Sequence, residues 1–168
     1  KKIINEGFSS EGTNVRTRWQ DGTEANYVSI VGVSNVYNVG KEFPMITLRN
    51  NSKTVMRAID EILWIWQKKS NKVADLNSHI WDQWVDENGT IGKAYGYQLG
   101  KKYEFKTKAG AKEMDQVDYV IYLLRNDPSS RRIMTNIFNF EDLKDMNLEP
   151  CAYGTQWLVK EGKLHLIL

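Results

Sequence analysis

TVMRAIDEILWIWQKK, residues 54–69, is the stretch that decides the fold, because it has the clearest helical periodicity in the chain. Its apolar side chains recur at the spacing of one helical face, which predicts a helix over residues 54–69 that is largely buried. Glu61 lies at the edge of the apolar arc, so we expect its carboxylate to be half-buried. Such a carboxylate is either a salt-bridged structural group or a proton-transfer group whose pKa is tuned by burial. The apolar face consists of Val55, Ile59, Ile62, Leu63 and Trp66, widened by Ala58 and Ile65.

On either side of this helix the sequence predicts a loop, a second helix and several strands. Residues 12–26 are polar and rich in turn-forming residues, which indicates a loop that carries Arg16 and Arg18. Apolar spacing predicts a helix over residues 113–125, which the Asn126-Asp127-Pro128 sequence ends. Strands are predicted over residues 27–33, 133–138, 156–159 and 163–168, with a Glu161-Gly162 turn between the last two. The C-terminal half is therefore β-rich.

The composition limits the classes of protein to which this chain can belong. The 168 residues, of which 41% are hydrophobic, suffice for one α/β or α+β domain, so we expect a single domain over residues 1–168. A net charge of +2 gives no field that favours DNA or an anionic membrane as a partner. The single cysteine excludes an internal disulfide and the two histidines lack metal-ligand spacing, so we expect a cytoplasmic protein without a metal. Because the sequence stops within the apolar run Leu166-Ile167-Leu168, we expect the natural protein to continue past residue 168.

Cys151 is the sharpest candidate for chemistry. It follows Pro150 at the point where a polar connection meets a predicted strand. Residue type alone favours a buried thiol that packs as a small hydrophobe, whereas a nucleophile needs a nearby cation that lowers its pKa. Arg131 and Arg132 are candidates for that cation. They follow two serines, a composition suited to binding a phosphate, although a solvated arginine pair beside a turn is the more ordinary interpretation.

Three aromatic residues leave a similar choice open. Trp81, Trp84 and Tyr95 are either core aromatics or a flat surface against which a heteroaromatic ligand stacks. Their spacing in the sequence does not decide between these two interpretations.

Five motifs, which together cover nearly the whole chain, occur in the order and at the separations found in thymidylate synthases. They are Glu61-Ile62-Leu63-Trp64, HIWDQWVDENG at residues 79–89, Ala94-Tyr95-Gly96, DPSSRRI at residues 127–133, and Pro150-Cys151 through Gln156-Trp157. The chain thus resembles this family. The resemblance implies an α+β fold of the thymidylate synthase type, with a mixed β-sheet and packed helices in a single domain that is truncated on its C-terminal side. It also implies a methyltransferase that converts deoxyuridylate (dUMP) to thymidylate (dTMP).

The resemblance further implies a role for each candidate residue. Cys151 is expected to attack C6 of the uracil of dUMP, while Glu61 and Tyr95 handle protons. The expected co-substrate is 5,10-methylenetetrahydrofolate, which donates carbon and hydride and leaves as dihydrofolate, and a homodimer is expected. Phosphate contacts are expected from Arg131 and Arg132 across the dimer interface and from Arg16 or Arg18, folate contacts from Ile80, Trp81, Trp84 and Arg49, and support of the nucleotide site from Gln156.

Two rival functions remain open at this point. A pyrimidine nucleotide hydroxymethylase of the same superfamily shares the cysteine attack and the folate donor but adds water where the synthase transfers hydride. A non-catalytic nucleotide- or RNA-binding relative would keep the fold without using a thiol nucleophile.

Overall fold

The computed structural model describes residues 2–45 and 52–168. The chain divides into two compact units, Lys1–Leu48 and Arg49–Leu168, and each is described by itself. Among the described residues, none of the helices combines the length and the apolar content that crossing a membrane requires. The prediction of a single domain over residues 1–168 stays a prediction.

The first unit contains little regular structure. It has a short helix, α1 (Lys2–Glu6), and two antiparallel strands, β1 (Phe8–Ser9) and β2 (Val28–Ser29). Residues 12–26 form the predicted loop. The hydroxyl of Ser10 joins the two ends of this loop, because it accepts a hydrogen bond from the backbone N–H of Tyr27 at 2.8 Å. The prediction of a strand over residues 27–33 is wrong beyond Ser29, because β1 offers only two residues for pairing.

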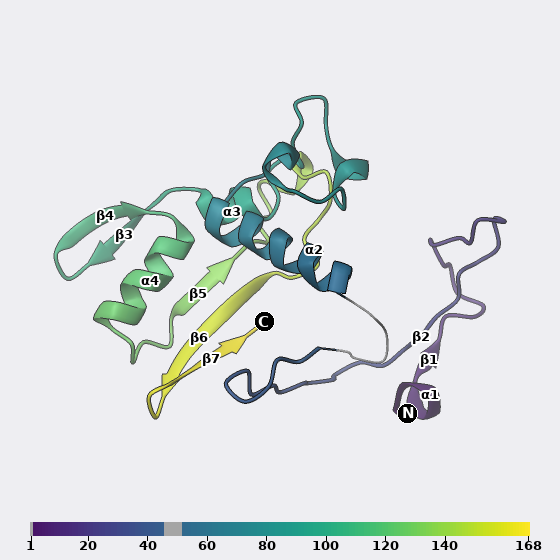
Figure 1. Cartoon of the computed structure of the whole chain (residues 1–168), viewed down its shortest axis with the longest axis horizontal. Coiled ribbons are helices and arrows are strands. Elements are labelled where there is room, and N and C mark those ends of the chain that lie inside the picture. The colour runs from purple at the N-terminus through teal and green to yellow at the C-terminus, as the bar shows by residue number, and fades with distance from the viewer. Residues whose placement is uncertain (1, 46–51) are drawn as a thin grey trace. The chain divides into compact units, whose positions relative to one another are not determined.

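The second unit is an α+β arrangement, which confirms the predicted fold class (Figure 1). Strand β6 (Gly154–Lys160) lies between β5 (Ile133–Asn136) and β7 (Lys163–Ile167), and β3 (Tyr103–Thr107) pairs with β4 (Gly110–Met114) as a separate hairpin. Every strand pair in the described ranges 2–45 and 52–168 is antiparallel. The predicted turn between β6 and β7 is confirmed, since Glu161 and Gly162 both have positive φ, as a two-residue hairpin turn requires.

The helix predicted over residues 54–69 forms in two parts. Helix α2 (Ser52–Leu63) continues into a π-helical turn, η1 (Trp64–Lys68), which ends where Lys69 adopts the left-handed conformation. The buried residues of this stretch are Trp64 and Ile65, at the start of η1. Trp64 is fully buried, and its indole N–H donates to the carbonyl of Lys72 at 3.0 Å.

The prediction that this helix is largely buried is wrong for α2 itself. The side chains of Ile59, Ile62 and Leu63 are 43%, 54% and 40% exposed. Periodicity identifies the apolar face of a helix but not what covers it, and in the described residues that face is only partly covered. The π-helical turn then redirects the chain, so burial begins at Trp64 instead.

Helix α4 (Gln116–Asn126) begins three residues later than the predicted residue 113. Glu113 and Met114 belong to β4, where they pair with Glu104 and Tyr103. Asp115 caps the helix by accepting the N–H of Asp118 at 2.9 Å, which fixes the first turn. In Figure 1, α4 lies alongside β5.

Asp115 is also a buried charge with two cationic partners. Its side chain is 2% exposed, and Oδ2 accepts from Lys69 Nζ at 2.6 Å and from Lys102 Nζ at 2.9 Å. Burial is the largest influence on the pKa of Asp115 and raises it, but Lys69, the N–H of Asp118 and Lys102 together outweigh burial and lower the pKa to about 2. Because Lys69 follows η1, this pair ties the end of the π-helical turn to the start of α4.

The main core of the second unit lies beneath η1. Short helices surround it, namely η2 (Val73–Asp75), η3 (Asp82–Trp84), α3 (Gly96–Gly100) and η4 (Leu143–Asp145). Its buried residues are Trp64, Ile65, Leu76, Trp81, Ile91, Ala94, Leu99 and Ile137. A smaller cluster of Val120, Leu123 and Ile133 joins α4 to the three-stranded sheet. Of the aromatic candidates, Trp81 belongs to the main core, and Trp84 and Tyr95 pack against it.

Candidate active site

Cys151 is exposed and lies in the loop between η4 and β6. Its backbone N–H donates to the phenol oxygen of Tyr95 at 3.0 Å. Cys151 is therefore not the buried thiol that its residue type alone favoured. An exposed thiol whose backbone is held by a tyrosine is available to a ligand.

A buried carboxylate network positions the loop that leads to Cys151. Asp142 is 5% exposed and binds Gln98 at 3.0 Å, Lys101 at 3.0 Å and Lys93 at 3.1 Å. The hydrogen bonds from Gln98, then Lys101 and Lys93, hold the pKa of Asp142 well below its usual range, so the group stays ionised. Because these partners lie in or beside α3, the network fixes the start of the Cys151 loop against the segment that carries Tyr95.

Tyr95 adopts an unusual backbone conformation. Its φ of 42° and ψ of −99° lie outside the regions that ordinary residues favour. Gly96 follows, and a Cβ atom at that position would lie 2.1 Å from the carbonyl oxygen of Ser70. Only glycine fits so close to the neighbouring backbone. The strained step therefore depends on Gly96, and it directs the phenol of Tyr95 toward Cys151.

Glu61 contacts this site through an indole. It is half-buried, as predicted, and its Oε1 accepts a hydrogen bond from Trp81 Nε1 at 2.6 Å. Trp81 in turn packs against the ring of Tyr95, with ring centroids 5.3 Å apart. Among the described residues, Glu61 makes no ion pair.

Tyr95 has a raised pKa. Burial is the main cause, and the nearby Cys151 and Glu61 add to it, while the hydrogen bond from the Cys151 backbone opposes it. A phenol with a raised pKa keeps its proton at neutral pH. The hydroxyl of Tyr95 is then able to accept from Cys151 and to donate its own proton elsewhere.

The tryptophans Trp81 and Trp84 differ in how deeply they are buried. Trp81 is 5% exposed, with its ring centroid 6.0 Å from that of Trp64, and belongs to the core. Trp84 is half-buried, and its ring centroid lies 5.2 Å from that of Trp81. Asn147 donates to the carbonyl of Trp84 at 2.7 Å. Trp84 is therefore the more exposed of the two tryptophans.

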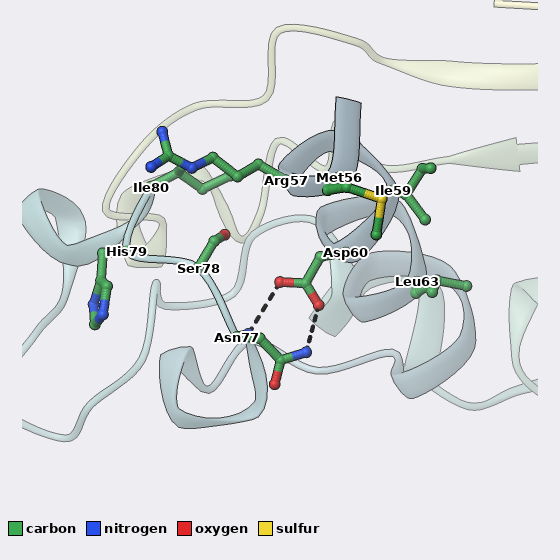
Figure 2. A pocket seen from close by; sticks show the side chains of 9 residues that line it. All are labelled: Met56, Arg57, Ile59, Asp60, Leu63, Asn77, Ser78, His79 and Ile80. Atoms are coloured by element: carbon green, nitrogen blue, oxygen red, sulfur yellow. Dashed lines mark hydrogen bonds between the residues drawn. The ribbon is translucent and has the colours of Figure 1, made fainter. Parts of the chain in front are cut away.

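Ile80 lines a cavity of about 790 Å³ between α2 and residues 77–80 (Figure 2). Asp60 holds that loop, since its carboxylate accepts from the backbone N–H of Asn77 at 3.0 Å and from the Asn77 amide at 2.8 Å. Sequence reasoning missed Arg57, Asp60 and Asn77, and the only sequence signal was that Arg57 and Asp60 share a helix with Glu61.

The arginine pair lies away from Cys151 within one chain. Arg131 and Arg132 precede β5, next to the pair Ile133↔Trp157, whereas Cys151 precedes Gly154 at the other end of the same ladder. Four paired positions separate the two ends, roughly 10 Å along the strand. The hypothesis that these arginines act on Cys151 within the same chain stays a prediction, although the two lie at opposite ends of this ladder.

Both arginines are exposed, and in the described part of the chain neither guanidinium has an ion-pair partner. Gln156 donates to the carbonyl of Arg131 at 2.9 Å, and the N–H of Arg132 donates to the hydroxyl of Ser130 at 3.2 Å. Their backbones are thus fixed while their charges are free to meet an anion.

Two of the other predicted contacts belong to the first unit. Arg16 and Arg18 belong to the first unit, where Arg18 pairs with Glu24 at 2.8 Å and Arg16 is exposed. Arg49, the remaining predicted folate contact, lies outside the described residues. Within residues 2–45 and 52–168, there is no group of three or more side chains placed to hold a metal ion.

Comparison with known proteins gives consistent matches. The family model described as "Thymidylate synthase" matches residues 1–168. The thymidylate synthase of Bacillus subtilis subsp. natto is 50% identical over 171 residues, and that of Bacillus licheniformis 52% identical, each covering 99% of this chain and 59% of the relative. The solved structure of thermostable thymidylate synthase A from Bacillus subtilis has a TM-score of 0.87 at 49% identity, covering 98% of this chain and 59% of that one. The chain spans about 59% of the length of these relatives.

Proposed function

This chain belongs to the thymidylate synthase family, and from that premise we propose that it catalyses the reductive methylation of dUMP to dTMP with 5,10-methylenetetrahydrofolate. The observation that carries the proposal is the contact series from Glu61 through Trp81 and Tyr95 to Cys151. It joins a carboxylate, a protonated phenol and an exposed thiol, which are the groups that covalent catalysis on a pyrimidine needs.

Cys151 acts as the nucleophile. Its thiolate forms a bond to C6 of the uracil, and the electron pair of the C5=C6 bond moves to C5, which becomes able to form a carbon–carbon bond. The hydrogen bond from the Cys151 N–H to Tyr95 supports this role, because it fixes the backbone that carries the sulfur. The exposure of the thiol supports it as well, since a substrate ring must reach it.

Glu61 and Tyr95 move the protons. Trp81 holds one oxygen of Glu61, which leaves the second oxygen to accept and return a proton at the pyrimidine. Tyr95 keeps its proton at neutral pH and donates it to a ligand or water beside Cys151. These two roles are distinct, because the carboxylate exchanges a proton at the pyrimidine and the phenol exchanges one beside Cys151.

The folate co-substrate fits the aromatic edge of the site. When bound, it supplies the one-carbon unit and then the hydride, and it leaves as dihydrofolate. Trp84 offers half-buried ring surface to a fused heterocycle, and Trp81 supports it from behind. Ile80 adds an apolar contact from the neighbouring cavity.

Arg131 and Arg132 bind the phosphate of dUMP in the partner subunit of a homodimer. Their distance from Cys151 along the β5–β6 ladder favours this arrangement over one within the same chain. Gln156 supports the nucleotide site indirectly by fixing the carbonyl of Arg131. Arg16 is the additional phosphate contact rather than Arg18, since Glu24 already pairs with Arg18. Arg49 remains a proposed contact to the folate tail. We also propose one folding domain and a cytoplasmic location.

The decisive experiment uses the full-length protein with 5-fluorodeoxyuridylate and 5,10-methylenetetrahydrofolate. Fluorine at C5 replaces the proton that must leave, so the reaction stops at a covalent complex of protein, nucleotide and folate. Intact-protein mass spectrometry should detect this adduct, and peptide mapping should assign it to Cys151. Cys151→Ser should form no adduct but should still bind dUMP. An active wild-type protein that forms no adduct would overturn the mechanism, and a hydroxymethylated product would identify the hydroxymethylase instead.

The partner-subunit role has its own test. Arg132→Ala and Cys151→Ser should each be inactive or severely impaired as homodimers. A mixed dimer carries one intact site only if the arginine and the cysteine of that site come from different subunits, so mixing the two variants should restore part of the activity. Failure to recover any activity in verified mixed dimers would show that both residues act within one chain.

A further inference from the structure

A second cavity, of about 430 Å³, lies among β3, the start of α4 and the segment that follows β5. Its volume is within the range of small-molecule sites. None of the described residues that line it belongs to the contact series from Glu61 to Cys151. The reaction proposed above therefore leaves this cavity without an assigned ligand.

Four aromatic rings line this second cavity. Tyr103 and Phe105 come from β3, with ring centroids 6.1 Å apart and ring planes at 62°. Phe138 and Phe140 follow β5, with ring centroids 5.3 Å apart and ring planes at 71°. Tyr119 stacks on Phe105 with a centroid distance of 3.8 Å, which holds the Phe105 ring in place. Because the rings of each pair are tilted, their electron-rich faces point in more than one direction, and such faces attract cations.

The amide groups of the lining are held by hydrogen bonds within the protein. Gln116 donates to the carbonyl oxygens of Gln98 and Asn136, each at 2.8 Å. It also accepts a hydrogen bond from the backbone N–H of Asn136 at 2.7 Å. These bonds fix the side chain of Gln116 in the cavity before any ligand binds. The selectivity of the cavity therefore depends on the rings and on Glu141.

Glu141 is the one charged residue among the described residues that line this cavity. It is exposed, and in the described part of the chain its carboxylate makes no ion pair. Lys101 already pairs with Asp142 at 3.0 Å, and its Nζ lies 6.0 Å from the centroid of the Tyr103 ring. The cavity thus combines aromatic ring faces with an uncompensated negative charge.

We propose that this second cavity binds a small quaternary or methylated ammonium ion through its aromatic ring faces and the carboxylate of Glu141. The methyl groups of such an ion carry part of its positive charge and fit against the rings, while Glu141 supplies the opposite charge. An inorganic cation lacks the apolar surface that the rings require, and Glu141 repels an anion. The inference does not depend on the proposed function, because the cavity shares no residue with the contact series that carries it.

The test compares two probes on the full-length protein. Choline carries a trimethylammonium group, and 3,3-dimethylbutan-1-ol has the same shape with a neutral carbon atom in place of the nitrogen. Titrations followed by saturation-transfer NMR of the methyl protons give the dissociation constant of each probe. Choline should bind about fivefold more tightly than the neutral alcohol, which is the scale of one cation–π contact.

Variants of the lining locate the bound cation. Phe140→Leu removes an exposed ring but keeps an apolar side chain, and Glu141→Gln removes the charge. Each should weaken choline binding about two- to fivefold and change the binding of the neutral alcohol much less. Glu104→Gln is the matched control, because Glu104 precedes Phe105 on β3 and faces the opposite side of the hairpin, and it should leave both dissociation constants unchanged. Lys112→Gln removes a cation opposite Phe105 and should leave choline binding unchanged or tighten it.

Three outcomes would overturn the inference. Equal dissociation constants of the two probes for the wild-type protein would show that the cavity does not distinguish a cation from a neutral molecule. Choline binding that both Phe140→Leu and Glu141→Gln leave unchanged would place the cation elsewhere on the protein. A wild-type protein that binds no choline at all would likewise refute it. The turnover of dUMP, measured separately, tests the proposed function and is unaffected by any of these results.

Discussion

Substitutions of Glu61 should separate its structural role from its chemical role. Trp81 is 5% exposed, and its indole N–H donates to Glu61 Oε1 at 2.6 Å. Glu61→Leu leaves that buried N–H without an acceptor. A hydrogen bond to a charged group contributes about 1.5–3 kcal/mol, so the free energy of unfolding should fall by about 2 kcal/mol. That is roughly a thirtyfold change in the unfolding equilibrium.

Glu61→Gln keeps a carbonyl acceptor for Trp81. A neutral hydrogen bond is about half as strong as a charge-assisted one, so the loss of stability should stay near 1 kcal/mol. Both variants remove the carboxylate that we propose moves protons, and each should lower kcat by about 10²- to 10⁴-fold. Glu61→Gln should therefore be nearly as stable as the wild type yet as inactive as Glu61→Leu.

The assay is urea unfolding of the full-length protein, followed by far-UV circular dichroism at one fixed protein concentration, because the proposed homodimer would make stability depend on concentration. A double-mutant cycle with Trp81→Phe provides the control, since Glu61→Leu should cost much less once the indole donor is gone. If Glu61→Leu proved as stable as Glu61→Gln, or if its cost were the same with and without Trp81, the hydrogen bond would not have the value assigned to it.

Three further predictions concern stability, backbone geometry and the phenol. The pKa of Asp115, lowered from 3.8 to about 2, implies stabilisation of about 2 kcal/mol. This stabilisation is fully present above pH 3.8 and is lost as the pH falls through 2. Asp115→Asn should remove the corresponding dependence of the free energy of unfolding on pH, measured by urea unfolding from about pH 7 to about pH 2. Gly96→Ala places a Cβ atom 2.1 Å from the carbonyl of Ser70, so the free energy of unfolding should fall by about 1–3 kcal/mol, and a wild-type unfolding curve would contradict this close approach. Tyr95→Phe removes the acceptor for the Cys151 N–H and should lower kcat at least about tenfold while stability changes by about 1 kcal/mol, whereas unchanged kinetics would exclude a role for the hydroxyl.

The sequence predicted the positions of helices and strands better than it predicted which of their side chains are buried. Apolar periodicity correctly located the helix that contains Glu61, because spacing along the chain determines which side chains share a face. The same periodicity did not reveal that Ile59 and Ile62 would be exposed, since burial depends on segments elsewhere. The hairpin of β3 and β4 was not predicted, although the alternation in Tyr103-Glu104-Phe105 before Gly110 is typical of one.

The candidate site was predicted mainly through family resemblance. Cys151 and Tyr95 are 56 positions apart in the sequence, and no local pattern indicates that the phenol of one would accept the N–H of the other. The cavity residue Arg57 carried no signal of its own, because an arginine on the polar side of a helix is ordinary. Contacts of this kind arise from tertiary packing and require the structure.

The π-helical turn Trp64–Lys68 makes the length of the chain itself a constraint on the site. A π turn contains one more residue than an α turn, so deleting one residue there would rotate everything that follows by about 100° relative to Glu61. The ring of Trp66 would leave Trp157, and Ser70 would leave the glycine that holds Tyr95 in place. Substitutions change side chains, but they do not change this rotation of the residues that follow the turn. A single-codon deletion between residues 64 and 68 should therefore be far more damaging than any single substitution at the exposed Gln67. Related sequences should differ in the identity of the residues in this segment but should keep the number of residues.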